Sequence, residues 1–257
     1  MPETVPTDEA GDGRLLELKL RALAEFAAGA GHEINNPIAT IIGYVQQLLA
    51  AERDPDRRHA LTTIGAQAYR IRDMIGDVML FARPPTPRPQ EIELAELVDE
   101  VSAKFADQAR DSRIRLQVES GPKAPVYADP VQLRVVVGSL LRNSMEALAS
   151  GGTIVIKAQP AEKAGRRWAL ITVQDDGPGL SEPDREHLFD PFYSGRQAGR
   201  GLGFGLSKCW RIVCMHGGRI EVESPPEGGT VITVLWPADR FAERTTDGDA
   251  ESQLGMS

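Results

Sequence analysis

Two long stretches of the sequence carry apolar residues three and four positions apart, and this spacing limits the fold more than any other feature. The first stretch contains Leu16, Leu20, Leu23, Ala27, Ala30, Ile34, Ile38, Ile41, Val45 and Leu48, and the second contains Leu61, Ile64, Ala68, Ile71, Ile75 and Val78. Such spacing is typical of helices that pack along a narrow apolar seam. The polar break ERDPD between the two stretches predicts that the helices form an antiparallel hairpin.

Two narrow seams bury little apolar surface by themselves, so the hairpin needs a further partner. Two hairpins can complete each other as a four-helix bundle in a homodimer, which is the arrangement we expect. The alternative is a monomeric hairpin that packs on the rest of the chain.

The segment RPPTPRP, Arg83 to Pro89, divides the chain because its prolines end the second helix and form a semi-stiff, extended spacer. Beyond it, helices are predicted near 95–110, 130–149 and 203–215, and strands near 114–118, 153–158, 168–174, 219–224 and 230–235. This pattern indicates an α+β fold class, in which a two-layer α/β sandwich follows the hairpin. The predicted organisation is a disordered tail (1–13), the hairpin (14–83), a Pro-rich linker (84–90), the sandwich domain (91–237) and a flexible acidic tail (238–257).

The composition excludes some partners. A net charge of −8 over 257 residues argues against nucleic acid or an anionic membrane surface as the main partner. No apolar run reaches the length of about 18 residues that a membrane-spanning helix needs. The acidic start MPETVPTDEAGDG lacks the basic and apolar regions of a signal peptide. We therefore expect a cytoplasmic protein without membrane insertion.

The motif GHEINNP interrupts the first helix with chemically active residues. His32 follows the seam residue Ala30 by two positions, which predicts that it points away from the partner helices. Glu33 can accept a proton from the imidazole and so make the other ring nitrogen a better nucleophile. Pro37 removes a backbone donor and loosens the helix, while Asn36 can orient a water or a phosphoryl group. Taken alone, the motif also fits an ordinary surface histidine beside a surface glutamate.

Three later motifs have the chemistry of a nucleotide site. In SLLRNSMEAL, the amide oxygen of Asn143 can bind Mg²⁺ without adding charge beside a triphosphate. In VQDDGPGL, Asp175 can accept a hydrogen bond from an exocyclic amino group, which favours adenine, and Gly177 and Gly179 keep the backbone close to the base. Each motif alone also has an ordinary structural explanation, as a helix residue or a turn.

The third motif, GRGLGFGLSK, places glycine at every second position before a helix. Its glycines, which include Gly201, Gly203 and Gly205, expose backbone N–H groups at a helix N-terminus, and such groups bind phosphate. The spacing matches neither the dinucleotide fingerprint nor the P-loop.

In this order, the motifs resemble those of the two-component sensor histidine kinases, from about Leu16 to Pro237. GHEINNP resembles the H box with His32 as the phosphoacceptor, and SLLRNSMEAL the N box with Asn143 at the Mg²⁺ position. DDGPGL resembles the first glycine box with Asp175 at the adenine. FDPFYSG, Phe189 to Gly195, resembles the F box, and GLGFGL the second glycine box. The resemblance implies a dimerisation and phosphotransfer hairpin plus an ATP-binding (Bergerat) sandwich like that of gyrase, Hsp90 and MutL. Within the family, the motif HEINNP is similar to that of the nitrogen-regulator-like kinases.

The resemblance implies an activity as well. Mg²⁺-ATP would phosphorylate His32, and the phosphoryl group would pass to an aspartate in the receiver domain of a separate response regulator. Asn36 would serve a phosphatase activity, Arg142 would help to neutralise the triphosphate, and an upstream sensor partner would supply the signal. Ser139 and Glu146 depart from the family pattern, which leaves an ATP-binding dimeric scaffold (a pseudokinase) as the alternative. An ATPase of the same fold would need a glutamate where Ser139 stands.

Overall fold

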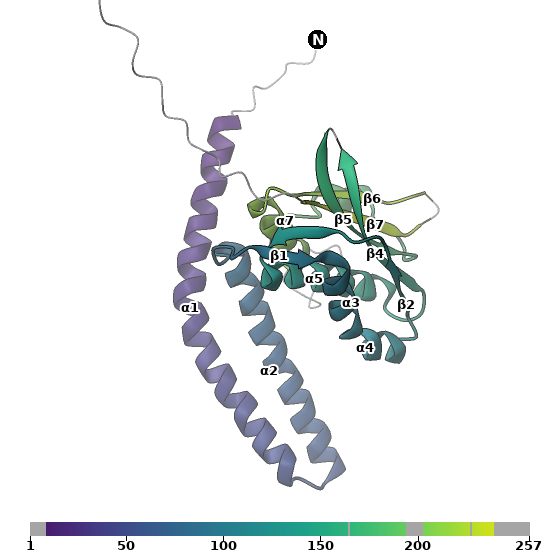
Figure 1. The fold of residues 1–257 in the computed structure, drawn as a ribbon. Coiled ribbons are helices and arrows are strands. Elements are labelled where there is room, and N and C mark those ends of the chain that lie inside the picture. Colours follow the sequence, from purple (N-terminus) through teal and green to yellow (C-terminus); the bar gives the residue numbers. More distant parts are fainter. Residues whose placement is uncertain (1–8, 164, 194–202, 227, 239–257) are drawn as a thin grey trace, which may run out of the picture.

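The computed structural model describes residues 9–163, 165–193, 203–226 and 228–238; within them, the side chains of residues 9–24, 26–28, 30, 32 and 120 are not described. The chain has two parts (Figure 1). A hairpin is formed by α1 (Glu9–Ala51) and α2 (Pro55–Ala82). An α/β domain, which runs from β1 to β7, lies beside the end of the hairpin that is far from its loop.

The turn of the hairpin is fixed by the cap of α2. The Asp54 carboxylate accepts hydrogen bonds from the backbone N–H groups of Asp56 and Arg57, both at 3.0 Å. Pro55 suits the first helical position because a residue there needs no N–H donor for the helix. The break that the sequence predicted at ERDPD is therefore a capped helix start.

The first helix is longer than the predicted first arm of the hairpin. Residues 1–13 were predicted to form a disordered tail, whereas α1 begins at Glu9. The helix thus starts five residues before the predicted hairpin boundary at residue 14.

The predicted apolar seam of the hairpin is only partly covered. Four of its residues are buried, namely Ile38, Val45, Ala68 and Val78. Four others keep 42–54% of their surface exposed, namely Ile41, Leu48, Ile64 and Ile71. The described chain thus leaves an apolar stripe uncovered along both helices.

A five-stranded sheet in the order β2-β4-β5-β7-β6 supports the α/β domain. Its strands are β2 (Arg115–Ser120), β4 (Thr153–Lys163), β5 (Arg166–Asp175), β6 (Arg219–Glu223) and β7 (Thr230–Pro237). β2 and β4 are parallel, and the other neighbours are antiparallel. The main core lies between this sheet and three helices, namely α3 (Leu94–Ala103), α5 (Pro130–Leu148) and α7 (Gly205–Met215). The predicted two-layer α/β sandwich is confirmed.

Shorter elements were not predicted. β1 (Gln90–Glu93) pairs with β3 (Pro125–Ala128) as a separate antiparallel ribbon. Strands of four residues carry too little alternation to be recognised from sequence. The helix predicted over 95–110 is divided into α3 and α4 (Ala106–Asp111), because the chain turns at Phe105, whose ring packs against the core. A short helix, α6 (Glu182–Glu186), was also missed.

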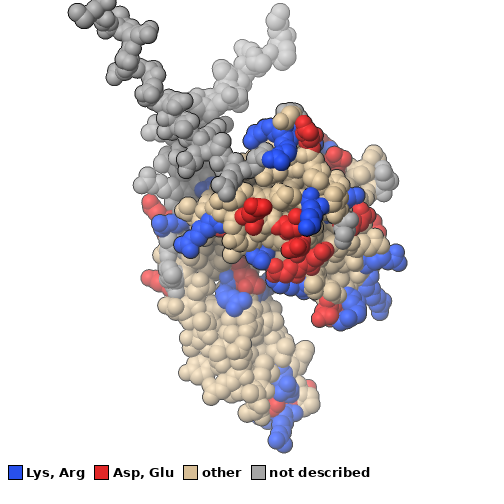
Figure 2. Space-filling model, in the orientation of Figure 1, with Lys and Arg blue, Asp and Glu red and all other residues tan. Residues whose placement is uncertain are grey.

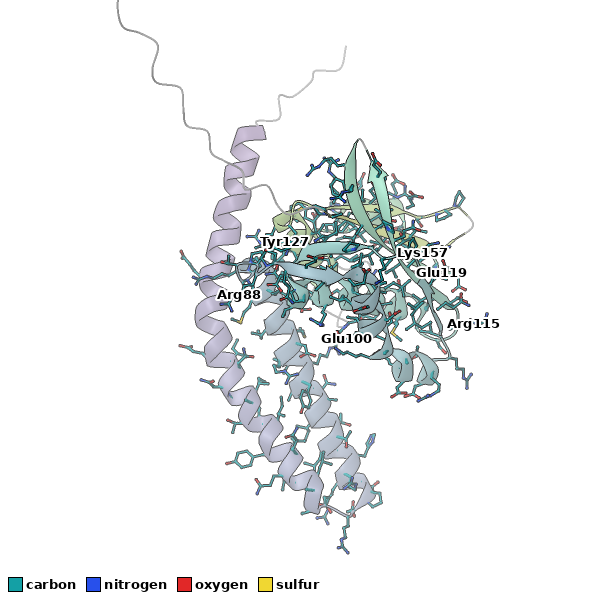
Figure 3. The ribbon with its side chains drawn as sticks, viewed as in Figure 1. Arg88, Glu100, Arg115, Glu119, Tyr127 and Lys157 are labelled. Carbon is teal, nitrogen blue, oxygen red and sulfur yellow. The ribbon has the colours of Figure 1, made fainter. Side chains whose placement is uncertain are left out.

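The Pro-rich segment is bound to the α/β domain instead of standing free as a spacer. Gln132 Nε2 donates to the carbonyl oxygen of Pro85 at 2.7 Å. The backbone N–H of Arg88, labelled in Figure 3, donates to Asp129 Oδ2 at 2.8 Å. The other carboxylate oxygen of Asp129 caps α5. The extended segment is therefore held against the start of α5 at Pro85 and Arg88.

A second contact joins the α/β domain directly to the hairpin. The Phe204 ring, just before α7, lies 5.4 Å from the Phe81 ring of α2, centroid to centroid. Both rings are buried together with Val78. Lys208 on α7 forms an ion pair with Asp77 on α2. The domain thus packs against the last turns of α2.

The surface shows no single dominant sign of charge on the face drawn in Figure 2, where acidic and basic side chains intermingle over the α/β domain. Within the ranges that the structure describes, every helix is too short or too polar to cross a bilayer.

Candidate functional site

Asp175, the last residue of β5, is the centre of the candidate site. Its side chain is buried, with 4% of the residue exposed. Ser144 Oγ donates to its Oδ2 at 2.9 Å, and the backbone N–H of Gly177 donates to its Oδ1 at 3.1 Å. Burial raises the pKa of Asp175, while the hydrogen bonds from Ser144, Gly177 and the Thr230 backbone act against that increase. The site therefore holds a carboxylate in one orientation.

The turn after Asp175 requires glycine for close approach. A Cβ on Gly177 would lie 2.9 Å from Asp175 Oδ1. Gly179 has a positive φ of 78°, and a Cβ there would lie 2.7 Å from Ser224 Oγ. Ser224 Oγ in turn accepts from Leu180 N at 2.9 Å. Both predicted glycines thus lie where the backbone must pass against the carboxylate and its neighbours.

A hollow of about 360 Å³ opens beside this turn. It is lined by residues of α5, the α5–β4 turn and the glycine turn, namely Ala147, Leu148, Ser150, Gly151, Gly152, Asp176, Gly177 and Pro178. A larger hollow of about 690 Å³ lies between the β1–β3 ribbon and the β4–β5 hairpin, where Figure 3 labels Tyr127. The larger hollow contains none of the motif residues, so the smaller one marks the site.

Helix α5 brings the N-box residues to the same place. Asn143 is half-buried and directly precedes Ser144, whose hydroxyl binds Asp175. Arg142 and Glu146 lie on the exposed side of the helix. Ser139 is 8% exposed and hydrogen-bonds Cys209 of α7, which faces it away from solvent. Ser144 thus places Asn143 near Asp175, although Ser144 itself was not predicted from the sequence.

The second glycine box lies at the N-terminus of α7. Gly201 falls outside the described residues. Gly203 has a positive φ of 73°, and a Cβ there would lie 2.2 Å from the carbonyl oxygen of Tyr193. Gly205 is the first residue of α7, and a Cβ on it would meet none of the described neighbouring atoms within 4 Å. Among the described residues, nothing therefore blocks an anion from the backbone N–H group at this first position of α7.

The F-box residues pack against the same glycines. Phe192 has a positive φ of 68°, and its ring meets the Phe204 ring edge-on, with the centroids 4.8 Å apart. Tyr193 donates its hydroxyl proton to Asp184 Oδ1 at 2.9 Å. Phe204 also contacts Phe81, so the F-box segment is linked to α2 through two ring contacts.

The H-box residues lie in the middle of α1. The side chain of His32 is outside the described residues, so its predicted direction remains untested. Glu33 and Asn36 are exposed. A Cβ on Gly31 would lie 2.5 Å from Met79 Sδ of α2. Because Met79 also packs against the Phe81–Phe204 cluster, the turn of α1 that carries His32 lies at the level of α2 where the α/β domain docks.

The residues suit the groups that the resemblance implies. A buried acceptor beside a hollow fits a base that carries an amino group, and the open first turn of α7 fits phosphate. Among the described residues, no cluster of three or more His, Cys, Asp or Glu could hold a metal ion, so a metal here would depend on ligands such as the Asn143 amide and phosphate oxygens.

The class of protein that the fold defines is a long helical hairpin joined to a two-layer α/β sandwich. Residues 22–87 match the His Kinase A (phospho-acceptor) domain model, and residues 128–240 match the model of the histidine kinase-, DNA gyrase B- and HSP90-like ATPases. The chain therefore belongs to the family of two-component sensor histidine kinases.

Individual relatives agree with this assignment. Sporulation kinase E of Bacillus subtilis is 29% identical over 225 residues, which cover 87% of this chain and 30% of that protein. The C4-dicarboxylate transport sensor protein DctS of Rhodobacter capsulatus is 34% identical over 229 residues, which cover 85% of this chain and 34% of that protein. This chain thus spans about a third of the length of each.

A solved complex shares the fold. The structure of histidine kinase ThkA with response regulator protein TrrA matches 93% of this chain and 68% of that chain, with a TM-score of 0.61 at 24% identity.

Proposed function

We propose that this chain is the kinase core of an ATP-dependent protein-histidine kinase. It would phosphorylate His32 from Mg²⁺-ATP and pass the phosphoryl group to an aspartate of a separate response regulator. The observation that carries the proposal is the buried, oriented Asp175 carboxylate beside a hollow, in a domain docked at the level of the H box. The functional units are the hairpin (14–83) and the ATP-binding domain (91–237), joined by the linker (84–90).

Asp175 would bind the adenine. Its carboxylate accepts the hydrogen bond of the exocyclic amino group, and Gly177 and Gly179 let the base approach the backbone. Gly201, Gly203 and Gly205 would bind the phosphates through backbone N–H groups at the start of α7, with Arg142 as a further cation. Asn143 would hold Mg²⁺, which offsets negative charge on the transferring phosphoryl group.

The transfer itself would use His32 and its neighbours. A ring nitrogen of His32 attacks the γ-phosphorus, the bond between that phosphorus and the bridging oxygen breaks, and ADP leaves with the electron pair. Glu33 takes the proton from the other ring nitrogen. Asn36, exposed one turn away, would orient the water that later hydrolyses the regulator's phosphoaspartate. Both side chains are exposed, so a protein partner can reach them.

A homodimer would cover the apolar stripe of the hairpin. Ile41, Leu48, Ile64 and Ile71 are joined on that surface by Tyr44, which is 63% exposed. An apolar stripe of this kind along two helices suits a second copy that completes a four-helix bundle. The partner in phosphotransfer would be a response regulator, as in the ThkA–TrrA complex. An upstream sensor partner stays a prediction of the family resemblance.

The test is incubation with γ-labelled ATP and Mg²⁺. Label that is lost in acid, survives alkali and disappears in His32→Gln supports the kinase. His59→Gln, which changes an exposed histidine on α2, is the matched control and should keep the label. If the chain binds ATP but takes up no acid-labile label, the ATP-binding scaffold replaces the kinase.

A further inference from the structure

Ser144 has a role that the family motifs do not assign. Only 1% of this residue is exposed, and it directly follows Asn143 on α5. Its hydroxyl donates to Asp175 Oδ2 at 2.9 Å. A buried serine hydroxyl can also turn toward the carbonyl of the preceding helical turn, as Thr40 Oγ1 does toward Asn36 O in α1. Ser144 instead donates its proton to the carboxylate of Asp175.

The hydrogen bonds around Asp175 determine what the carboxylate can still accept. An ionised carboxylate has about four acceptor positions and no donor. Ser144 uses one position on Oδ2, the Gly177 N–H uses one on Oδ1, and the Thr230 backbone supplies a further bond. The carboxylate is thereby fixed in orientation, with acceptor capacity left for one more donor.

We propose that Ser144 is a positioning residue that keeps Asp175 an oriented hydrogen-bond acceptor and so sets the preference of this site for adenine over guanine. The proposal rests on the proposed function, because it assumes that Asp175 binds the base. Adenine presents an amino donor at the position where guanine presents a carbonyl acceptor. An ionised carboxylate attracts the first and repels the second, whereas a protonated carboxyl can donate to guanine and loses the discrimination.

The groups around Asp175 make the protonation of its carboxylate depend on the hydrogen bond from Ser144. Burial favours the neutral acid, and the Ser144 hydrogen bond is the largest contribution that opposes it. The charged group that acts on Asp175 is Asp176, which raises the pKa of Asp175 further. On α5, the residues near Asp175 are the apolar Ala147 and Leu148, whereas Arg142 and Glu146 lie on the exposed side of the helix. The residues paired with Asp175 on the neighbouring strands, Ile154 and Thr230, are uncharged. Removing the hydroxyl therefore shifts Asp175 toward its neutral form.

The test compares Ser144→Ala with the natural protein in calorimetric titrations with Mg²⁺-ATP and Mg²⁺-GTP between pH 5 and pH 9. We expect ATP to bind more weakly to Ser144→Ala, because the Asp175 carboxylate loses a hydrogen bond that orients it and opposes its protonation. The ratio of ATP to GTP affinity should fall, and the pH below which ATP affinity declines should move upward. A purely structural defect would weaken both nucleotides alike and leave that pH unchanged.

Two further variants separate the proposal from a packing effect. Ser102→Ala removes an equally buried hydroxyl, 2% exposed, from α3, where its Oγ has no hydrogen-bond partner in the described structure; it should change neither nucleotide. Ser144→Thr keeps the hydroxyl and should restore the natural pH dependence. If Ser144→Ala does not fold, Ser144→Cys fills the same space with a weaker donor and should give an intermediate shift.

The outcomes distinguish the two proposals. If the natural protein binds ATP and Ser144→Ala shows the same nucleotide ratio and the same pH dependence, the role of Ser144 is refuted while the kinase proposal stands. If the natural protein binds neither nucleotide, the kinase proposal fails, and the role of Ser144 fails with it.

Discussion

The contact between α2 and α7 predicts which single substitution uncouples the hairpin from the ATP-binding domain. Phe81→Ala removes a ring that is 4% exposed and lies 5.4 Å from the Phe204 ring. Truncating a buried phenylalanine costs about 3 kcal/mol or more, which corresponds to over a hundredfold change in the docking equilibrium. The ion pair between Asp77 and Lys208 is partly exposed, with side-chain exposures of 36% and 11%. Asp77→Asn should therefore cost about 1 kcal/mol or less.

Differential scanning calorimetry measures this coupling. The natural protein should unfold with its hairpin and ATP-binding domain coupled, whereas Phe81→Ala should give two separated transitions. Phe192→Ala is the matched control, because it removes a ring that contacts Phe204 but belongs to the F box of the domain itself. Equal effects of Phe81→Ala and Asp77→Asn, or an unchanged transition in Phe81→Ala, would refute the reasoning that apolar packing holds the two parts together.

Three other predictions concern single contacts. Asp129→Ala removes both the cap of α5 and the hydrogen bond that holds Arg88, so the free energy of unfolding of the ATP-binding domain should fall by about 1–2 kcal/mol in chemical denaturation. The control is Asp107→Ala, which changes an exposed acidic residue of α4; an equal loss in both variants would contradict the prediction. Glu100, labelled in Figure 3, binds Arg134 and Lys104, and these bonds lower its pKa from 4.5 to about 2. A carboxylate with a depressed pKa stabilises the fold above its unfolded pKa, so the stability difference between the natural protein and Glu100→Gln should shrink as pH falls from about 4.5 to about 2; a constant difference would exclude this linkage. Gly203→Ala would place a Cβ 2.2 Å from Tyr193 O at a φ of 73°, so ATP affinity should drop at least tenfold by calorimetry; an unchanged affinity would contradict this.

The sequence points to candidate site residues but not to the contacts that support them. Asp175 and Asn143 can be picked out from the sequence because each lies in a recognisable motif of consecutive residues. Ser144 cannot, since its role depends on α5 and β5 being brought together and on the direction of one hydroxyl. The docking of Phe204 on Phe81 is equally invisible, because the two residues are far apart in sequence and neither belongs to a periodic pattern.

The secondary-structure elements likewise divide into those that a local sequence pattern predicts and those that depend on distant contacts. The long helices of the hairpin and the sandwich strands have strong periodicity, and the structure confirms the fold class. The four-residue strands β1 and β3 are stabilised by pairing across more than thirty positions of sequence, which no local pattern encodes. Likewise, four prolines predict an extended segment but cannot predict that Asp129 and Gln132 hold it against α5.

The most direct test of the account is site mapping of the phosphorylated protein by mass spectrometry under alkaline conditions, after incubation with Mg²⁺-ATP. The account predicts phosphohistidine at His32 in the natural protein and none in Asp175→Asn, which removes the carboxylate proposed to bind adenine. Phosphate on another residue, or phosphohistidine at His32 that persists undiminished in Asp175→Asn, would contradict it.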